Sequence, residues 1–247
     1  MDITQEFYNN IASQYDKLFQ DWQSTIHEQA VILNRIFNDN GFDTTAHILD
    51  CACGIGTQSI GLAALGYRVS ASDISAAEII EAKERAKKNN VDIRFELADF
   101  RGLADRFSEQ FDIVIAMDNA LPHMLSNKDL EAAIKSITEQ TKPNGIIVAS
   151  IRDYDRLLEE KPSYSPPYIY KTDKGQRVCF QTWTWKNDNY HLGNISSRMS
   201  RPFKQVNLNV NTEPSVEKNS PLFLELMDVR KCNGRCQKRQ AFISRLL

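Results

Sequence analysis

The stretch that decides the fold is Asp50-Cys51-Ala52-Cys53-Gly54-Ile55-Gly56-Thr57. A short apolar run ends at its aspartate and an amphipathic segment follows it, an order that predicts a strand, a tight turn and a helix. Small residues at positions 52, 54 and 56 let a ligand lie directly on the backbone, because a side chain there would fill the ligand's space. Asp50, Ala52, Gly54 and Gly56 are therefore candidate binding residues, although an ordinary strand-to-helix turn shows the same pattern.

A second acid stands at the spacing expected of a nucleoside site. Residues 66–73 predict a second strand that ends in Asp73, 19 positions after Gly54. In a doubly wound sheet, an acid about 20 residues past the glycine turn lies beside that turn and can accept both ribose hydroxyls. Asp73 can also cap the helix predicted over 76–88, and the two roles are compatible. Ile74, the next residue, is a further candidate for contact with the ligand.

The spacing of apolar residues predicts the remaining architecture. We expect two helices before the first strand, at 6–19 and 22–37, with Tyr8, Tyr15 and Trp22 as the residues able to close over a site. Beyond Asp73 the pattern predicts helices at 76–89 and 130–140, strands at 93–97, 111–117 and 146–151, and a turn at 143–145. This alternation is typical of an α/β fold with a doubly wound, mainly parallel Rossmann-like sheet.

The chain after Arg152 has a different character. Residues 177–185 alternate into two faces before a turn at 186–189, so antiparallel strands are expected there, either at the sheet edge or as a cap. We therefore predict an N-terminal helical lid at 1–37, a binding core at 38–155, and a cap hairpin with closing strands at 156–247.

Composition bounds the class of protein. The chain has 247 residues, 42% of them hydrophobic, and a net charge of −2, which gives no general attraction to nucleic acid. No apolar run approaches the roughly 18 residues that cross a bilayer, and the acidic N-terminus does not resemble a signal peptide, so a cytoplasmic location is expected. Cys51 and Cys53 lack a second ligand pair at zinc spacing, which favours packing over a metal site. Residues 195–247 alone are basic, with ten Lys and Arg against four Asp and Glu.

The turn favours a nucleoside without phosphates. It lacks the Gly-Lys-Ser/Thr ending of a triphosphate loop, and Ser59 stands where a dinucleotide site usually has its third glycine. The ribose would then bind Asp73, and the adenine would lie beside Asp99 and Phe100. Asp99 could accept from the adenine amino group and Phe100 could stack on the ring, or they could be a capping acid and a core aromatic.

Several motifs together carry a resemblance to a known family. They are the turn at 50–57, Asp73, Ala98-Asp99-Phe100, the segment from Asp118 to Leu125, and Arg152-Asp153-Tyr154-Asp155. Over roughly residues 5–192 the chain resembles class I S-adenosylmethionine-dependent methyltransferases, and more narrowly the glycine and sarcosine N-methyltransferases. The resemblance implies S-adenosylmethionine as the cofactor, with Asp118 among its contacts, and a small amino-acid-like acceptor.

The resemblance also implies roles at the acceptor site. Asn119 and Arg152 would face the acceptor, and Tyr170 would help the N-terminal aromatics to close the site. The family's arginine near the cofactor carboxylate is absent here, so His27 or Gln29 would have to replace it. Residues beyond about 195 do not resemble the family's closing strands.

Physical chemistry is consistent with these roles. Methyl transfer from a sulfonium needs mainly an in-line arrangement of nucleophile, methyl and sulfur. Arg152 suits bidentate capture of an acceptor carboxylate, unless it pairs with Asp153 or Asp155. Asn119 could orient the amine through its side-chain oxygen, and His123 could take a proton or be structural. Tyr15 or Trp22 could present a ring face to the sulfonium.

The sequence therefore predicts an enzyme that methylates an amine nitrogen of a glycine- or sarcosine-like small molecule. An O- or C-methyltransferase acting on a larger metabolite is the alternative if the Pro-rich loop at 163–168 opens a wide apolar pocket. A third possibility is a cofactor-binding protein that contacts RNA or regulates through its basic tail, for which salt-sensitive binding would be diagnostic. Neither a membrane nor a metal partner is expected.

Overall fold

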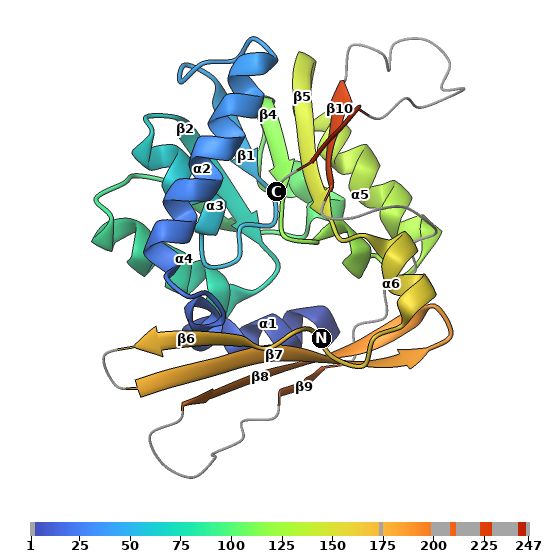
Figure 1. Cartoon of the computed structure of the whole chain (residues 1–247). Helices are drawn as coiled ribbons and strands as arrows, with labels where there is room; N and C mark the ends of the chain where they lie inside the picture. Colours follow the sequence, from blue (N-terminus) through green and yellow to red (C-terminus); the bar gives the residue numbers. More distant parts are fainter. Residues whose placement is uncertain (1–2, 173–174, 199–207, 211–222, 229–241, 246–247) are drawn as a thin grey trace.

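The computed structural model describes residues 3–172, 175–198, 208–210, 223–228 and 242–245, and these form two sheets (Figure 1). The larger sheet has the strand order β11-β10-β5-β4-β1-β2-β3. Its strands are β1 His47–Asp50, β2 Arg68–Asp73, β3 Arg94–Leu97, β4 Phe111–Ala116, β5 Thr141–Ile151, β10 Phe223–Asp228 and β11 Phe242–Arg245. The smaller sheet has the order β6-β7-β8-β9, with β6 Tyr168–Thr172, β7 Gly175–Lys186, β8 Asn189–Arg198 and β9 Leu208–Val210.

The larger sheet is parallel from β3 to β5; β10 pairs antiparallel with β5, and β11 pairs antiparallel with β10. The expected doubly wound α/β fold is therefore confirmed. All four residues of β1 are buried and β4 is nearly so, as expected for central strands covered on both faces. The strand order reverses between β1 and β4. Ligands of such sheets bind outside the carboxyl ends of the strands at this reversal.

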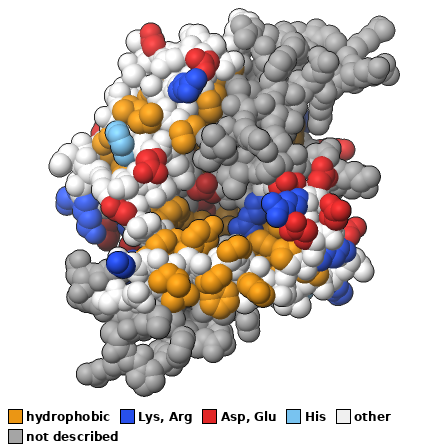
Figure 2. Space-filling model, viewed as in Figure 1, with side chains coloured by type: hydrophobic (Ala, Val, Ile, Leu, Met, Phe, Trp, Pro, Cys, Tyr) orange, Lys and Arg blue, Asp and Glu red, His pale blue; other side chains and the backbone are white. Residues whose placement is uncertain are grey.

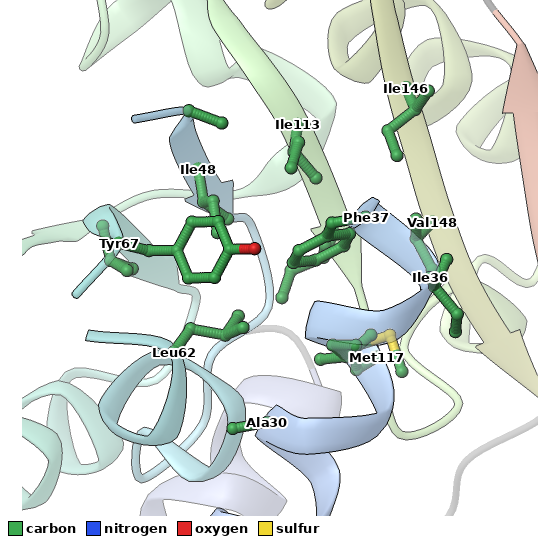
Figure 3. Packing of buried hydrophobic residues seen from close by; sticks show 14 residues of the cluster. Ala30, Ile36, Phe37, Ile48, Leu62, Tyr67, Ile113, Met117, Ile146 and Val148 are labelled. Atoms are coloured by element: carbon green, nitrogen blue, oxygen red, sulfur yellow. The ribbon is translucent and has the colours of Figure 1, made fainter. Parts of the chain in front are cut away.

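Helices cover both faces of the larger sheet. They are α2 Trp22–Asp39, α3 Thr57–Ala64, α4 Ala76–Lys88, α5 Asn127–Glu139 and the 3-10 helix η2 Phe100–Asp105. One core cluster joins α2 to the sheet, and Figure 3 shows its residues Phe37, Ile48, Ile113 and Val148. The ring of Phe37 meets that of Tyr67 edge to face, with 5.7 Å between centroids. Helix α2 thus belongs to the core layer. Of the helical lid predicted at 1–37, only the segment before α2 lies over the strand ends.

That segment differs from the single helix expected at 6–19. It consists of α1 Ile3–Ile11 followed by the 3-10 helix η1 Ala12–Leu18. Helix α1 lies between the carboxyl ends of the parallel strands and the smaller sheet (Figure 1). Phe7 and Ile11 of α1 pack against Tyr190 and Leu192 of β8. The smaller sheet is consequently a cap rather than an extension of the larger sheet's edge.

Other local expectations also need correction. The turn predicted at 143–145 lies inside β5, where Asn144 has a φ of 68° and the pairing register with β4 shifts. An Asn-Gly pair is compatible with this left-handed conformation, so the chain forms an irregularity in the strand instead of leaving it. The helix α6 Tyr154–Glu160 and strand β6 were not predicted. The predicted hairpin is confirmed: β7 and β8 are joined by Asn187 and Asp188, with a φ of 57° at Asn187.

The basic tail lies largely outside the described residues, apart from the ends of β8 and the backbones of β9, β10 and β11. Within the described ranges, no helix combines the length and the apolar character needed to cross a bilayer. Hydrophobic side chains gather on the visible face of the smaller sheet (Figure 2). Tyr168 and Ile169 of β6 are more than half exposed, at 57% and 62%.

Candidate active site

The glycine turn between β1 and α3 has the close geometry expected of a binding turn. Gly54 and Gly56 have φ values of 51° and 89°, in the left-handed region that favours glycine. A Cβ at Gly56 would lie 2.9 Å from Cδ1 of Ile60, and one at Gly54 would lie 3.3 Å from Oε2 of Glu78. The turn is held by hydrogen bonds from the N–H of Cys51 to the carbonyl of Ile115 and from the N–H of Gly56 to the carbonyl of Cys53.

A first pocket of about 740 Å³ opens over this turn. Most of the predicted cofactor residues line it: Tyr15, Ala52, Gly54, Asp73, Ile74, Asp99, Phe100 and Asp118. The pocket is also lined by residues that the sequence did not predict, among them Thr4, Glu78, Met117 and Met124. Residues of α1, of the end of β2 and of the loops that follow β1 and β4 are thus brought to one place, at the reversal of strand order.

Three predicted cofactor residues do not line this pocket. Asp50 is fully buried beneath the turn and accepts a hydrogen bond of 2.6 Å from the hydroxyl of Ser59. Burial raises its carboxyl pKa to about 7. Gly56 begins α3. The indole N–H of Trp22 donates to Oγ1 of Thr57, and the Arg85 guanidinium lies 4.8 Å from the centre of its ring. Asp50 and Gly56 shape the turn, whereas the face of Trp22 is occupied by a protein cation.

Asp73 is held rigidly at the end of β2. One of its oxygens accepts a hydrogen bond of 2.9 Å from the N–H of Gly54, and the other accepts one of 2.8 Å from the N–H of Ser75. Burial raises the pKa of this carboxyl despite these hydrogen bonds. Ser75, not Asp73, caps α4, because its hydroxyl accepts from the N–H of Glu78. Asp73 therefore fixes the relation between the glycine turn and β2.

Asp99 caps the helix η2 and also forms an ion pair. It accepts from the backbone N–H of Arg101, and its two oxygens accept from the guanidinium of the same residue. That guanidinium also contacts Asp129 of α5 at 3.0 Å. Phe100 packs partly against the core cluster on this side of the sheet. Both residues line the first pocket while taking the structural roles that the sequence left open.

A second pocket, of about 500 Å³, adjoins the first and shares Tyr8, Tyr15, Asp118 and His123 with it. It brings together Asn119, His123 and Arg152, three of the four predicted acceptor residues. Tyr170 is not among its lining residues; its hydroxyl lies 3.5 Å from the carbonyl oxygen of Leu18, and its ring stacks on Tyr168. Gln181 and Tyr190 of the cap sheet line the second pocket and were not anticipated.

Asp118 and Asn119 are held in an unusual backbone conformation where the two pockets meet. Their φ values are 54° and 70°, and strained backbone of this kind clusters at functional sites. The side-chain oxygen of Asn119 accepts from the N–H of Arg152 and from the hydroxyl of Tyr154. That oxygen is therefore engaged, contrary to the expectation that it orients an amine, and the amide NH₂ is the remaining polar group.

A polar chain reaches this junction from α2. The side-chain nitrogen of Gln58 donates to Gln29 and to the carboxylate of Asp118, at 2.6 and 2.9 Å. His27, the other residue considered in place of the family's arginine, is exposed. Of the two, only Gln29 is connected to the site.

Arg152 follows β5 and is held by neutral groups. Its guanidinium donates to Oε1 of Gln181 at 2.8 Å, contacts the hydroxyl of Tyr190 at 3.5 Å, and lies 5.4 Å from the centre of the Trp183 ring. Asp153, the acid next to it, caps α6 by accepting from the N–H of Arg156. In the described part of the chain Arg152 forms no ion pair, but its charge acts on Asp118, which lines the same pocket and whose carboxyl pKa it lowers against the larger effect of burial.

His123 and Tyr8 form the opposite side of the second pocket. The Tyr8 hydroxyl and His123 Nε2 are 2.9 Å apart, and the rings meet edge to face. Burial raises the phenol pKa of Tyr8 and of Tyr15, so both are neutral hydrogen-bonding groups at physiological pH. Helix α1 is fastened over the pockets by Gln5, which donates to the carbonyl of Ile74, and by Asn9, which accepts from Ser75 and Ala77.

Part of the chain is similar to known methyltransferases. Residues 48–145 match the family model described as "Methyltransferase domain". The chain is 30% identical to a glycine/sarcosine N-methyltransferase of Parasynechococcus marenigrum over 155 residues, which are 63% of this chain and 54% of that protein. It is 31% identical to a demethylmenaquinone methyltransferase of Leptospira interrogans over 158 residues, 59% of each chain. The chain thus spans less than two thirds of the length of these relatives.

A solved structure agrees in fold. An S-adenosylmethionine-dependent methyltransferase from Clostridium acetobutylicum aligns with a TM-score of 0.65 and 19% identity, covering 85% of this chain and 82% of that one. The alignment includes most of the described chain, so the larger sheet and much of what covers it share that arrangement.

Proposed function

We propose that this chain, which carries a class I S-adenosylmethionine-dependent methyltransferase domain, transfers a methyl group to an amine nitrogen of a small carboxylate-bearing acceptor. Its cofactor is S-adenosylmethionine, which supplies a methyl group activated by a positively charged sulfur. Two observations on the pockets support the proposal, one for the cofactor and one for the acceptor.

The first pocket suits an adenosine derivative. Its floor includes Gly54, where the lack of a side chain lets a ligand approach the backbone closely; a Cβ there would lie 3.3 Å from Oε2 of Glu78. The carboxyl of Asp73 beside it offers acceptors for ribose hydroxyls, Ile74 and Phe100 offer apolar contact for a purine, and Tyr15 a ring face for a cation. We assign the ribose to Asp73, the adenine to the Ile74 and Phe100 side, and the amino-acid arm to residues 52–54.

The guanidinium of Arg152, which is held by neutral hydrogen-bond partners and forms no ion pair among the described residues, is the single observation that carries the acceptor assignment. A planar guanidinium held by neutral partners at a pocket wall is suited to bind a carboxylate through two parallel hydrogen bonds. The pocket that Arg152 lines opens onto the cofactor pocket at Tyr8, Tyr15, Asp118 and His123. An acceptor anchored there by its carboxylate would have its other end directed toward the methyl donor.

The remaining residues orient and deprotonate the amine. Methylation requires the nitrogen lone pair, which forms the new N–C bond as the S–C bond breaks, and one proton then leaves the nitrogen. We assign that proton to His123 Nε2, reached directly or through the Tyr8 hydroxyl, because the two atoms are 2.9 Å apart at the pocket wall. The amide NH₂ of Asn119 would donate to the acceptor carboxylate beside Arg152.

Glycine and sarcosine are the acceptors we favour within this class. The relative from Parasynechococcus marenigrum bears their names. The alternative of a larger metabolite depended on the loop at 163–168, which lines neither pocket. Ser165 instead exchanges hydrogen bonds with the backbone of Gln181, which fastens the loop along β7.

The acceptor proposal is tested by an acceptor screen with radiolabelled cofactor on the wild-type chain and on Arg152→Gln. We expect methyl transfer to glycine or sarcosine, and a fall in kcat/KM of about 100-fold or more in Arg152→Gln, because a charge-assisted carboxylate contact is lost. The dissociation constant for S-adenosylhomocysteine should stay within about twofold. Arg156→Gln, which removes an exposed arginine paired with Glu160, is the matched control. Unchanged transfer in Arg152→Gln would refute the carboxylate clamp.

A further inference from the structure

Glu78 is a further carboxyl in the wall of the cofactor pocket, which Asp73, Asp99 and Asp118 also line. It lies in the first turn of α4, lines the first pocket, and is only 2% exposed. Among the described residues its Oε1 atom has no hydrogen-bond partner. A buried polar atom left unpaired in a native fold requires an explanation, and a ligand in the adjoining pocket is one.

The local structure shows why this carboxyl is available. Ser75 and Glu78 have the spacing of a capping box, in which the acid normally accepts from the N–H of the capping serine. Here the serine hydroxyl does accept from the N–H of Glu78, at 3.1 Å. The N–H of Ser75, however, donates to Asp73 at 2.8 Å. Asp73 has taken the bond that the capping box would give to Glu78, which releases the Glu78 side chain toward the pocket.

The released carboxyl lies next to the assigned ribose site. Oε2 of Glu78 is 3.3 Å from the position that a Cβ of Gly54 would occupy, and the N–H of Gly54 donates to Asp73 at 2.9 Å. Each oxygen of Asp73 already accepts one backbone N–H, so part of its capacity is used. A vicinal diol presents two donors and two acceptors. A second carboxyl at this edge can form the hydrogen bonds to the diol that Asp73 cannot.

The charge state of Glu78 fits the same role. Burial raises the pKa of its carboxyl well above the usual range, and the neighbouring Asp73 adds to this. The phenols of Tyr8 and Tyr15, which also face the pocket, are neutral. A protonated Glu78 can therefore donate as well as accept, and it does not repel the carboxylate of Asp73.

We propose that Glu78 is a cofactor-binding residue that completes the ribose site begun by Asp73, with its carboxyl hydrogen-bonded to a ribose hydroxyl. The inference rests on the proposed function only in taking the ligand to be an adenosine derivative. It assigns recognition of the diol to two acids, from the end of β2 and the first turn of α4.

Calorimetric titration of the full chain tests this without turnover. S-adenosylhomocysteine and its 2′-deoxy and 3′-deoxy analogues are each titrated into wild type, Glu78→Leu and Glu78→Gln. For S-adenosylhomocysteine we expect affinity to fall about tenfold in Glu78→Leu and less than about threefold in Glu78→Gln, which keeps an acceptor. At least one deoxy analogue lacks the ribose hydroxyl that Glu78 would bind. For that analogue, Glu78→Leu should lower the affinity by less than about twofold. An equal loss for all three ligands, or none, would overturn the proposal.

A further ligand and a control sharpen the result. 5′-Methylthioadenosine keeps the ribose and lacks the amino-acid arm, so the Glu78→Leu effect should persist with it. Loss of the effect would place Glu78 on the amino-acid arm and overturn the ribose assignment. Glu84→Gln removes an exposed acid of the same helix and should bind as wild type does. If the wild-type chain bound none of these ligands, the proposed function itself would fail; intact wild-type binding with unaltered variants would refute only the role of Glu78.

Discussion

At the scale of single residues, the site is built on acids that the fold removes from water. Asp50, Asp73, Glu78 and Asp118 are all buried, and burial raises the pKa of each carboxyl. Their side chains surround the glycine turn, where a cofactor with a cationic sulfur and several hydroxyl donors would bind. Groups with perturbed protonation in a cleft are typical of functional sites, and here the cause is desolvation rather than a nearby cation.

Asp50 gives a prediction on stability, because it is buried and outside both pockets. Its pKa is about 7 in the folded chain against a usual 3.8, so between these values the folded state holds a proton that the unfolded state has lost. Its contribution to the free energy of unfolding therefore falls as pH rises from about 4 to about 7. Asp50→Asn, which carries no such proton, should gain on the order of 2 kcal/mol relative to wild type between pH 5 and pH 8.

Urea unfolding at several pH values measures this difference. Asp43→Asn is the control. Hydrogen bonds from Thr45 lower the pKa of that exposed carboxyl, so its titration can change stability only below about pH 4. The difference in the free energy of unfolding between Asp43→Asn and wild type should therefore be constant from pH 5 to pH 8. A constant difference between Asp50→Asn and wild type over this range would show that Asp50 is not protonated in the fold.

At the scale of elements, the close approach of α2 and α3 positions the glycine turn. Gly61 of α3 lies directly against α2, since a Cβ there would fall on the carbonyl oxygen of Ile26 and 2.8 Å from Cβ of Ala30. Helix α3 begins at Gly56 and thus shares its position with the floor of the cofactor pocket. The same contact places Gln29 of α2 within hydrogen-bonding distance of Gln58 of α3.

Gly61→Ala should therefore destabilise the fold, although alanine is the better helix former. Helix propensity would favour alanine by about 1 kcal/mol, but separating two packed helices costs about 1–3 kcal/mol, and the carbonyl of Ile26 is backbone that cannot rotate away. We expect a net loss of up to about 2 kcal/mol by denaturant unfolding. Gly102→Ala, whose Cβ would meet only a carboxylate oxygen at 3.4 Å, should change stability less. A Gly61→Ala variant as stable as wild type would mean that the helices separate without cost.

At the scale of the whole molecule, helix α1 links the two sheets. Phe7 and Ile11 pack on the cap sheet, while Gln5 and Asn9 bind the turn after Asp73. Thr4 and Tyr8 of the same helix line the cofactor pocket. The cofactor, the β2–α4 turn and the cap are therefore expected to respond together when a ligand binds.

Amide hydrogen exchange of the whole chain tests this coupling. Adding S-adenosylhomocysteine should slow exchange in α1 as well as in the turn at 52–56 and the start of α4, because ligand binding stabilises the structure that it contacts. Asn9→Ala, which removes the acceptor for Ser75 and Ala77, should reduce the protection of α1. Protection confined to the turn would show that α1 closes independently of the cofactor.

The amino-acid sequence by itself determined the parallel sheet and most of the residues that gather in the pocket over the glycine turn. Strands and helices follow from apolar periodicity, and a glycine turn followed by an acid at fixed spacing is a local pattern that forces a local geometry. The sequence was less informative at Pro143-Asn144-Gly145, which indicated a turn. An irregular strand accommodates the same residues when a neighbouring strand pairs with it, as β4 pairs with β5.

Only the tertiary structure decided which side chains meet. The sequence could not show that Arg85 covers Trp22, that Tyr170 does not line the acceptor pocket, or that Asp73 displaces Glu78 from its capping role. Nor could it bring Gln181 and Tyr190 to Arg152, from a sheet that lies across the strand ends. Such contacts join residues distant in the chain, and packing of whole elements sets them, whereas sequence patterns report only the periodicity within each element.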